Sequence, residues 1–144
     1  MLNWDKLYLA LKEYLDVRTQ SAGKIWSLAH SPDLLPYRKE LLNLWRFEIH
    51  HAVLLNSLFQ SLGYNQINIT AKENQMKSNI KNDLVEIVNW KEVWLPKIEQ
   101  MAAESFGNDI HSKLTIIIAD ETVNIELLKD LQGRITITPK VNNN

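Results

Sequence analysis

The sequence lacks cysteine entirely and carries no excess of either charge. Without cysteine among its 144 residues, disulfide bonds and thiolate metal sites are excluded, so a metal site would have to use carboxylate, imidazole or amide ligands. The 16 Lys and Arg residues nearly balance the 17 Asp and Glu residues, and neither sign forms a long run. We therefore expect no basic surface for nucleic acid or anionic lipid, and no nucleic-acid partner.

Long hydrophobic runs are also missing. Asp5, Lys6 and Lys12 interrupt the amino-terminal stretch, which is not the pattern of a signal peptide. Residues 52–71 carry no charge, but their Asn, Gln and Ser content is too high for a membrane span. The length suits one domain with its own core. These absences predict a soluble, cytoplasmic, single-domain protein without a membrane partner.

Apolar residues recur with a period near 3.6 in four segments separated by proline and glycine, which is typical of amphipathic helices. Apolar and polar residues alternate, as is typical of a strand, only in "RITITPKV" near the carboxyl end. We predict an all-α fold in which residues 1–133 form a four-helix bundle and 134–144 a short extended tail. The predicted helices span about 3–29, 37–62, 75–105 and 110–131.

Two of these apolar stripes contain acidic residues at their centres. Glu48 and His51 are three residues apart on the second predicted helix, and Glu121 and Asn124 have the same spacing on the fourth. At about 100° per residue, each pair lies on one helix face. A carboxylate in a core is costly unless a cation, a proton or a metal ion neutralises it. The pairs therefore mark a candidate site inside the bundle.

The segments Glu48-Ile49-His50-His51 and Glu121-Thr122-Val123-Asn124 resemble the metal-binding motifs of the second and fourth helices of the ferritin-like superfamily. The resemblance implies a core holding one or two metal ions and, from the first and third helices, one glutamate each. Hard carboxylate ligands with one imidazole favour iron or manganese. The implied activity, if the protein is an enzyme, is oxygen or peroxide chemistry by a metal-dependent oxidoreductase with an unidentified substrate.

The resemblance places the single glutamates about 35 residues before the two motifs, where Glu13 and Glu86 stand. Glu13 lies nearly opposite the apolar stripe of its helix and is expected to face solvent. Glu86 lies at the edge of its stripe, and Asp83 lies closer to the centre. The expected metal ligands are therefore Glu48, His51, Glu121, Asn124 and Glu86, with Asp83 as an alternative to Glu86.

Arg18 is the polar residue on the core side of the first predicted helix. Its guanidinium group can bind a carboxylate through two hydrogen bonds and so replace a metal ion as the neutralising charge. The alternative function is then a non-catalytic interaction or structural protein whose inward charges form a network around Arg18. Asn124, in place of the histidine implied by the resemblance, favours this alternative because an amide is a weaker ligand.

Three further questions stay open in the sequence. The residues after Gly63 are just long enough to cross the bundle, whereas a helix start at Thr70 would leave a simple up-down-up-down order. A homo-oligomer, most simply a dimer, is expected because apolar residues such as Leu9, Val17 and Phe47 lie off the core stripes. Five tryptophans offer a small-ligand pocket as a third functional option.

Overall fold

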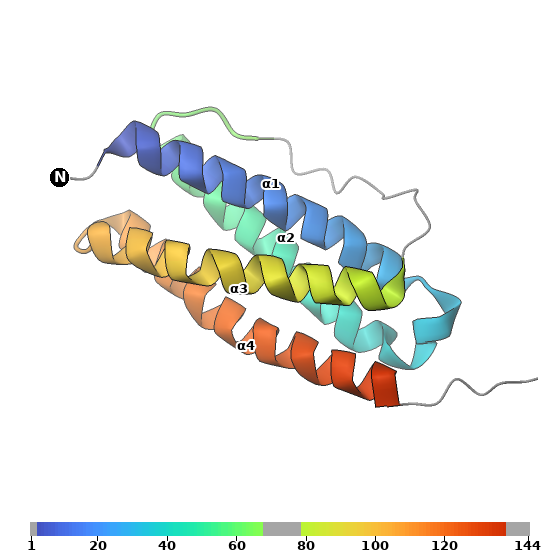
Figure 1. Ribbon diagram of the computed structural model, residues 1–144. Coiled ribbons are helices and arrows are strands. Elements are labelled where there is room, and N and C mark those ends of the chain that lie inside the picture. The colour runs from blue at the N-terminus through green and yellow to red at the C-terminus, as the bar shows by residue number, and fades with distance from the viewer. Residues whose placement is uncertain (1–2, 68–78, 138–144) are drawn as a thin grey trace, which may run out of the picture.

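The computed structural model describes residues 3–67 and 79–137, and within these ranges the regular structure is entirely helical. Figure 1 shows four long helices side by side, and a short 3₁₀ helix follows the first. The all-α four-helix architecture predicted from the periodicity is confirmed. The elements are α1 (Trp4–Ala29), η1 (Pro32–Tyr37), α2 (Arg38–Ser61), α3 (Ile80–Glu104) and α4 (Asp109–Ile137).

Local sequence signals explain where the helices begin and end. The side chain of Asn3 caps α1 by accepting a hydrogen bond from the Lys6 amide at 3.1 Å. Asn79 caps α3 in the same way through the Asn82 amide at 3.3 Å. Gly63 and Gly107 have φ angles of 84° and 88°, which glycine adopts without steric cost, and they lie in the turns that follow Ser61, the last residue of α2, and Glu104, the last residue of α3.

The ends of α3 and α4 differ from the prediction. The extended backbone of Asn79 makes it the cap, so α3 begins at Ile80 rather than Gln75; residues 75–78 lie outside the described ranges. The predicted stop of the fourth helix at Leu131 is wrong, because α4 continues through Gly133 to Ile137. Residues 134–137 of the predicted extended tail are thus helical, and 138–144 are not described.

Contacts between helix ends define the helix directions. Tyr64, just after α2, donates a hydrogen bond to Asp5 near the start of α1. Lys24 near the end of α1 contacts Asp83 at the start of α3, with Nζ 3.1 Å from Oδ1. The start of α3 therefore lies at the opposite end of the bundle from the end of α2 (Figure 1). α2 and α3 therefore run in the same direction, which decides the open topology in favour of a crossover over an up-down-up-down order.

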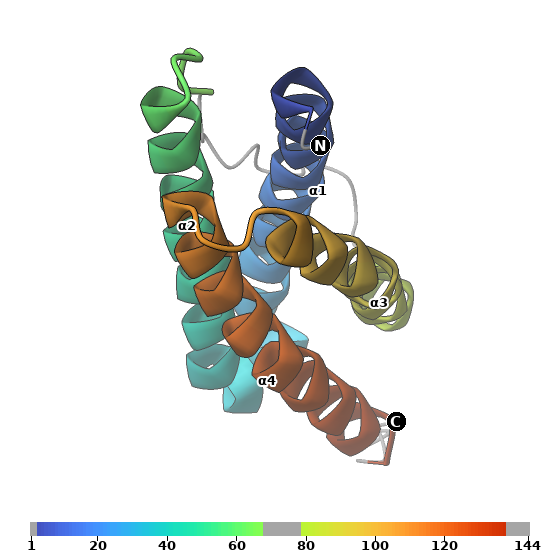
Figure 2. The same ribbon diagram turned by 90° about the vertical axis from the view of Figure 1, so that its left-hand side faces the viewer.

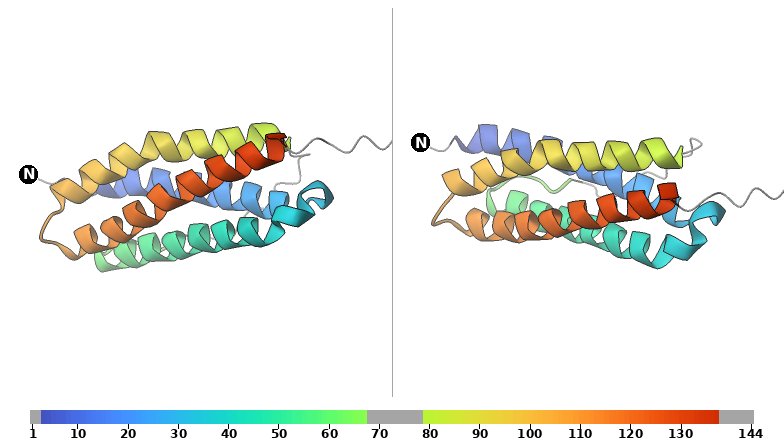
Figure 3. Two further views of the ribbon diagram at one scale, coloured as in Figure 1. Left: turned by 90° about the horizontal axis from the view of Figure 1, so that it is seen from below. Right: turned by 60° about the horizontal axis from the view of Figure 1, so that its bottom comes forward.

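The helices form two antiparallel pairs, α1 with α2 and α3 with α4 (Figure 2). Seen from below, α4 lies between α3 and α2 (Figure 3), and Arg134 of α4 binds Glu40 at the start of α2. The apolar core is divided into two clusters, one packed around Leu11 and Phe59 and the other around Ile25 and Leu41. A layer of polar side chains lies between the two clusters along the bundle axis.

None of the described helices is long and apolar enough to cross a membrane. The apolar residues instead face the two clusters, as expected for amphipathic helices in a bundle. Trp4 shares a helix face with the buried residues Leu7 and Leu11, yet 42% of its surface is exposed. It lies at the first residue of α1, where fewer neighbouring helices cover a side chain.

Candidate functional site

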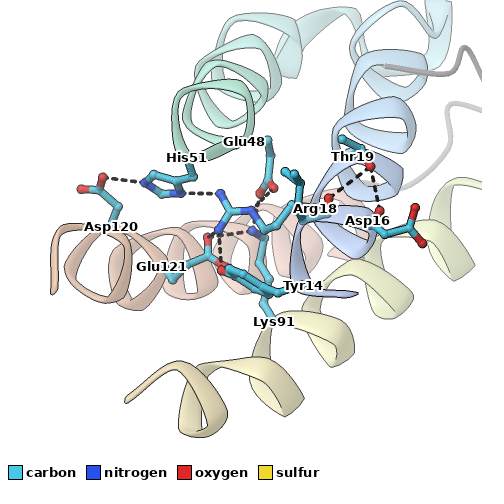
Figure 4. A network of polar contacts seen from close by, with 10 residues as sticks. Tyr14, Asp16, Arg18, Thr19, Glu48, His51, Lys91, Asp120 and Glu121 are labelled. Atoms are coloured by element: carbon cyan, nitrogen blue, oxygen red, sulfur yellow. Dashed lines mark hydrogen bonds and ion pairs between the residues drawn. The ribbon is translucent and has the colours of Figure 1, made fainter. Parts of the chain in front are cut away.

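Each of the four helices contributes at least one charged or polar side chain to the layer between the apolar clusters (Figure 4). The layer is almost completely shielded from solvent, and its innermost residues are at most 3% exposed. Buried charges of this kind persist only when they are paired. The members are Tyr14 and Arg18 from α1, Glu48 and His51 from α2, Lys91 from α3, and Asp120, Glu121 and Asn124 from α4.

Glu48 and Glu121 share the same two cations. Arg18 Nε lies 2.7 Å from Glu48 Oε2, in an ion pair that is not aligned as a hydrogen bond, and Arg18 Nη1 lies 3.0 Å from Glu121 Oε1. Lys91 Nζ donates to Glu121 Oε1 at 2.8 Å and also to Glu48 Oε1. Two carboxylates are therefore balanced by one guanidinium and one ammonium group, and we call these four residues the ionic core.

Glu121 and Arg18 of the ionic core stay charged despite burial. Desolvation by itself raises the pKa of Glu121, but the positive charges of Arg18 and Lys91 outweigh it and lower the pKa to about 2. Desolvation likewise opposes the charge on Arg18, yet Glu121 and Glu48 raise the pKa of that guanidinium further above its usual range. Glu121 is consequently ionised and Arg18 protonated over the whole physiological range.

Tyr14 is attached to the ionic core. Its hydroxyl accepts a hydrogen bond from Arg18 Nη1 at 2.7 Å and lies 3.5 Å from Glu121 Oε2, to which it donates. Desolvation is the main cause that raises the pKa of Tyr14, so the phenol remains protonated. The ring also packs against Trp94, with 5.3 Å between the ring centroids. Tyr14 thus joins the ionic core to the adjacent apolar cluster.

His51 connects the ionic core to Asp120 at the edge of the bundle. Arg18 Nη2 can only donate, so the contacting Nδ1 of His51 accepts, and Nε2 carries the proton that is donated to Asp120 Oδ2 at 2.7 Å. Desolvation is the largest cause that lowers the pKa of His51 to about 4, and the charge of Arg18 acts in the same direction. The imidazole is therefore neutral at neutral pH.

The structure brings together most of the residues selected from the sequence. Glu48, His51, Glu121 and Asn124 all lie in the buried layer, and the inward position predicted for Arg18 is confirmed. Glu86 does not join them: its carboxylate is 46% exposed and lies 3.6 Å from Lys24 Nζ. The alternative to Glu86, Asp83, pairs with the same lysine near the end of the bundle, also apart from the ionic core.

Lys91 was not predicted as a member of the site, although its position in the sequence carried a signal. Lys91 lies four residues after Ile87 and three before Trp94, both of which belong to the core stripe of α3. A charged residue at such a position is either buried with a partner or breaks the stripe. Tyr14 was not predicted either, although its position carried a similar signal. It lies between Leu11 and Arg18 on the inward face of α1.

Asn124 differs from the charged members of the layer, because its side-chain amide makes neither a hydrogen bond nor an ion pair within residues 3–67 and 79–137. It is 1% exposed and lies on the same face of α4 as Glu121, one turn further along. Neither its Oδ1 nor its Nδ2 has a hydrogen-bond partner within the described part of the chain. By contrast, buried Asn56 of α2 uses both amide atoms to bind the backbone of Ile67, at 2.7 and 2.9 Å.

Known proteins add no assignment to this geometry. Comparison with protein families, curated proteins and solved structures finds no match. The chemistry of the site therefore has to be argued from its own residues. Within residues 3–67 and 79–137, no group of three or more His, Asp or Glu side chains is arranged to hold a metal ion.

The donor set does not fit a metal ion as it stands. Lys91 and Arg18 occupy the carboxylate oxygens of Glu48 and Glu121 that face the interior, and Arg18 also occupies Nδ1 of His51. A divalent ion would either have to displace Lys91 or add two uncompensated positive charges to a balanced site. The arrangement can hold four helices in one register and exclude water from the core, without a metal.

The tryptophans do not gather at this site. Trp26 contacts Trp45, with 4.8 Å between ring centroids, and Trp94 packs on Tyr14. Trp90 lies under the ammonium group of Lys24, and Trp4 is largely exposed. These separate contacts favour packing roles over a shared aromatic pocket.

Proposed function

We propose that this protein is a ferritin-like helical bundle without a working metal centre, which serves as a non-catalytic structural or interaction protein. The observation that carries the proposal is the position of the Lys91 ammonium group, in contact with both Glu48 and Glu121. It supplies the positive charge that a metal ion would supply between two carboxylates. Arg18 completes the neutralisation from the opposite side.

The helix order supports the ferritin-like part of the proposal. Two antiparallel helix pairs joined by one long crossover are the arrangement of ferritin-like bundles, whereas most simple bundles have only short loops. The two motif-bearing helices, α2 and α4, are the ones expected from the resemblance. Their motif residues Glu48, His51 and Glu121 converge in the core.

Charge balance supports the non-catalytic part. Glu48 and Glu121 contribute two negative charges, and Arg18 and Lys91 contribute two positive charges at distances of 2.7 to 3.0 Å for three of the four contacts. Buried ions are tolerated when they are fully paired and hydrogen-bonded. The pairing is complete without an external ion, and the site therefore has no electrostatic need for one.

The rival function is metal binding by Glu48, His51 and Glu121, with iron or manganese as the ion. Its support is the convergence of these three side chains and the free amide of Asn124, which has an oxygen available as a ligand. It requires Lys91 to leave the carboxylates. This requirement makes the two proposals separable by measurement.

The test is metal analysis of the full chain after growth with added iron and manganese and purification without a chelator. We expect far less than one equivalent of either metal and a melting temperature that neither added Fe²⁺ nor a chelator changes. The Glu48→Gln variant should lose stability without any change in metal content. Glu86→Gln serves as the control, since that carboxylate is exposed and lies outside the ionic core.

A metal content that depends on Glu48 would contradict the proposal. Near-stoichiometric iron or manganese in the wild-type protein that is lost in Glu48→Gln and retained in Glu86→Gln would overturn the proposal. It would establish the rival function and assign Glu48 as a ligand. An exchange of Lys91 for metal would then be part of how the site is loaded.

A further inference from the structure

One flank of α4 exposes three large apolar side chains in a row along the helix. Ile116, Val123 and Leu127 follow one another at spacings of seven and four residues, and they are 47%, 58% and 46% exposed. Asp120 belongs to the same row, and its carboxylate points toward α2, where it binds His51. The row therefore runs along the border between α4 and α2.

α2 continues this apolar surface on its own side of the border. Phe47 is 38% exposed, and its ring centroid lies 6.1 Å from that of His51, the residue that contacts α4. Leu54, two turns further along the same flank, is partly buried. We call the surface formed by these residues the α2/α4 face: Phe47, Leu54, Ile116, Asp120, Val123 and Leu127.

Charged residues of opposite sign flank the α2/α4 face. α2 and α4 run antiparallel, and their register is given by the contacts of Glu40 with Arg134 and of His51 with Asp120. Interpolated between these contacts, Arg46 of α2 lies at the level of Glu126 of α4. Both side chains are exposed, and by helical spacing each lies on the outer side of its helix, away from the border.

We propose that a second copy of this chain docks on the α2/α4 face to form a two-fold dimer. With the axis parallel to the bundle, α2 of one protomer lies over α4 of the other at the same level. Arg46 of each protomer then faces the partner's Glu126, so the interface contains two equivalent ion pairs. Phe47 meets the partner's Val123 and the partner's Leu127 between these ion pairs.

The choice of a second copy follows from this self-complementarity. An isologous interface requires one patch to match itself after rotation, and the positions of Arg46 on α2 and Glu126 on α4 exchange places under this axis. Apolar patches rimmed by charge are typical of protein contacts. An unrelated partner would have no reason to match both positions at one level.

The dimer is independent of the function proposed for the ionic core. The ionic core is buried between the apolar clusters, whereas the α2/α4 face is on the outside and shares with it only the His51–Asp120 link. A protein that binds metal can still form this dimer, and a metal-free one can still be a monomer. Metal analysis therefore tests the proposed function, and measurements of the oligomeric state test the dimer.

The first test is sedimentation equilibrium of the full chain, repeated for a matched pair of variants. Val123→Lys places a charge inside the α2/α4 face, and Val93→Lys places the same charge on α3. The two valines are 58% and 56% exposed, so their effects on folding should be alike. We expect a wild-type dimer, at least a tenfold weaker dimer for Val123→Lys, and a wild-type dissociation constant for Val93→Lys.

The second test reverses the proposed ion pairs. Arg46→Glu and Glu126→Arg should each weaken the dimer, because each brings like charges together twice, and the double variant should recover most of the lost affinity. Circular dichroism of each variant checks that the helices remain formed. A wild-type monomer would overturn the proposal, as would equal weakening by Val93→Lys and Val123→Lys or a double variant weaker than both singles.

Discussion

Lys91 shows how a single side chain changes the chemistry available to two glutamates. Without it, Glu48 and Glu121 would share only Arg18, leaving an excess negative charge in a region where water is excluded. A buried carboxylate in that situation attracts either a proton or a metal ion. The ammonium group on its flexible stem reaches both carboxylates and satisfies them. One residue of α3 therefore accounts for the difference between the proposed structural role and the rival metal-binding role.

Asn124 provides a prediction about an unpaired amide. Burying a polar group without a partner costs about 1 to 3 kcal/mol, so Asn124→Leu should increase the free energy of unfolding by roughly that amount. Asn56→Leu should decrease it, because both amide atoms of Asn56 bind the backbone of Ile67. Urea denaturation of the two variants measures the contrast. Equal destabilisation by both would mean that Asn124 has a binding partner, as the metal-binding rival requires.

At the level of elements, the His51–Asp120 hydrogen bond joins α2 to α4 and depends on pH. The pKa of His51 is about 4 in the folded protein, compared with 6.5 for an ordinary histidine. As the pH falls from 6.5 to 4, the unfolded chain binds this proton before the folded one does, so the folded state loses stability. Protonation also removes the acceptor that Arg18 uses on Nδ1.

Glu121 adds a second loss of stability at lower pH. Its pKa is about 2 in the folded protein and 4.5 ordinarily, so its contribution is complete above pH 4.5 and disappears as the pH falls to 2. We expect His51→Gln to flatten the stability profile between pH 6.5 and 4, by roughly 2 to 3 kcal/mol, and to leave the loss below pH 4.5 in place. Urea denaturation across this pH range measures both windows.

His50 is the control for this profile, because it is the exposed neighbour of His51 and lies outside the buried layer. His50→Gln should reproduce the wild-type loss of stability in both windows. A wild-type slope between pH 6.5 and 4 in His51→Gln would contradict the assignment of that window to His51. The α2 to α4 link would then not be the acid-sensitive element.

The helices themselves were largely predictable from the sequence. Periodic apolar residues and capping residues placed the boundaries of α1 and α2 within one residue. The end of α4 was not predictable, because Gly133 and the alternating "RITIT" both argue locally against a helix. Arg134 binds Glu40 of α2, and this contact holds the last turns of α4 against α2. Tertiary contacts therefore override the local preference at this end.

At the scale of the whole molecule, the two apolar clusters should stabilise the fold without the ionic core. Replacing all members of a buried ion network with apolar residues is often neutral or stabilising by about 1 to 4 kcal/mol, whereas removing one partner costs about 3 to 5 kcal/mol. A combined apolar variant should therefore remain helical and unfold with at least wild-type free energy, as measured by urea denaturation. It carries Tyr14→Phe, Arg18→Met, Glu48→Leu, Lys91→Met and Glu121→Leu.

The single variant Lys91→Met gives the contrast. It should be destabilised by about 3 to 5 kcal/mol because it leaves a buried charge without its partner. Lys129→Met is the matched control, since Lys129 pairs with Glu92 at 3.2 Å on the surface and should cost less than about 1 kcal/mol. If the combined variant unfolds more easily than Lys91→Met, the ionic core rather than the apolar clusters maintains the fold.

The sequence alone determined that four helices form and that Arg18, Glu48, His51 and Glu121 face inward, because the 3.6-residue period decides which residues share a helix face. Only the tertiary structure decided that Lys91 bridges the glutamates, that Glu86 stays outside and that the connection after α2 crosses the bundle. The period is a local property, whereas the partner that meets a face depends on how distant helices pack, which no single segment encodes.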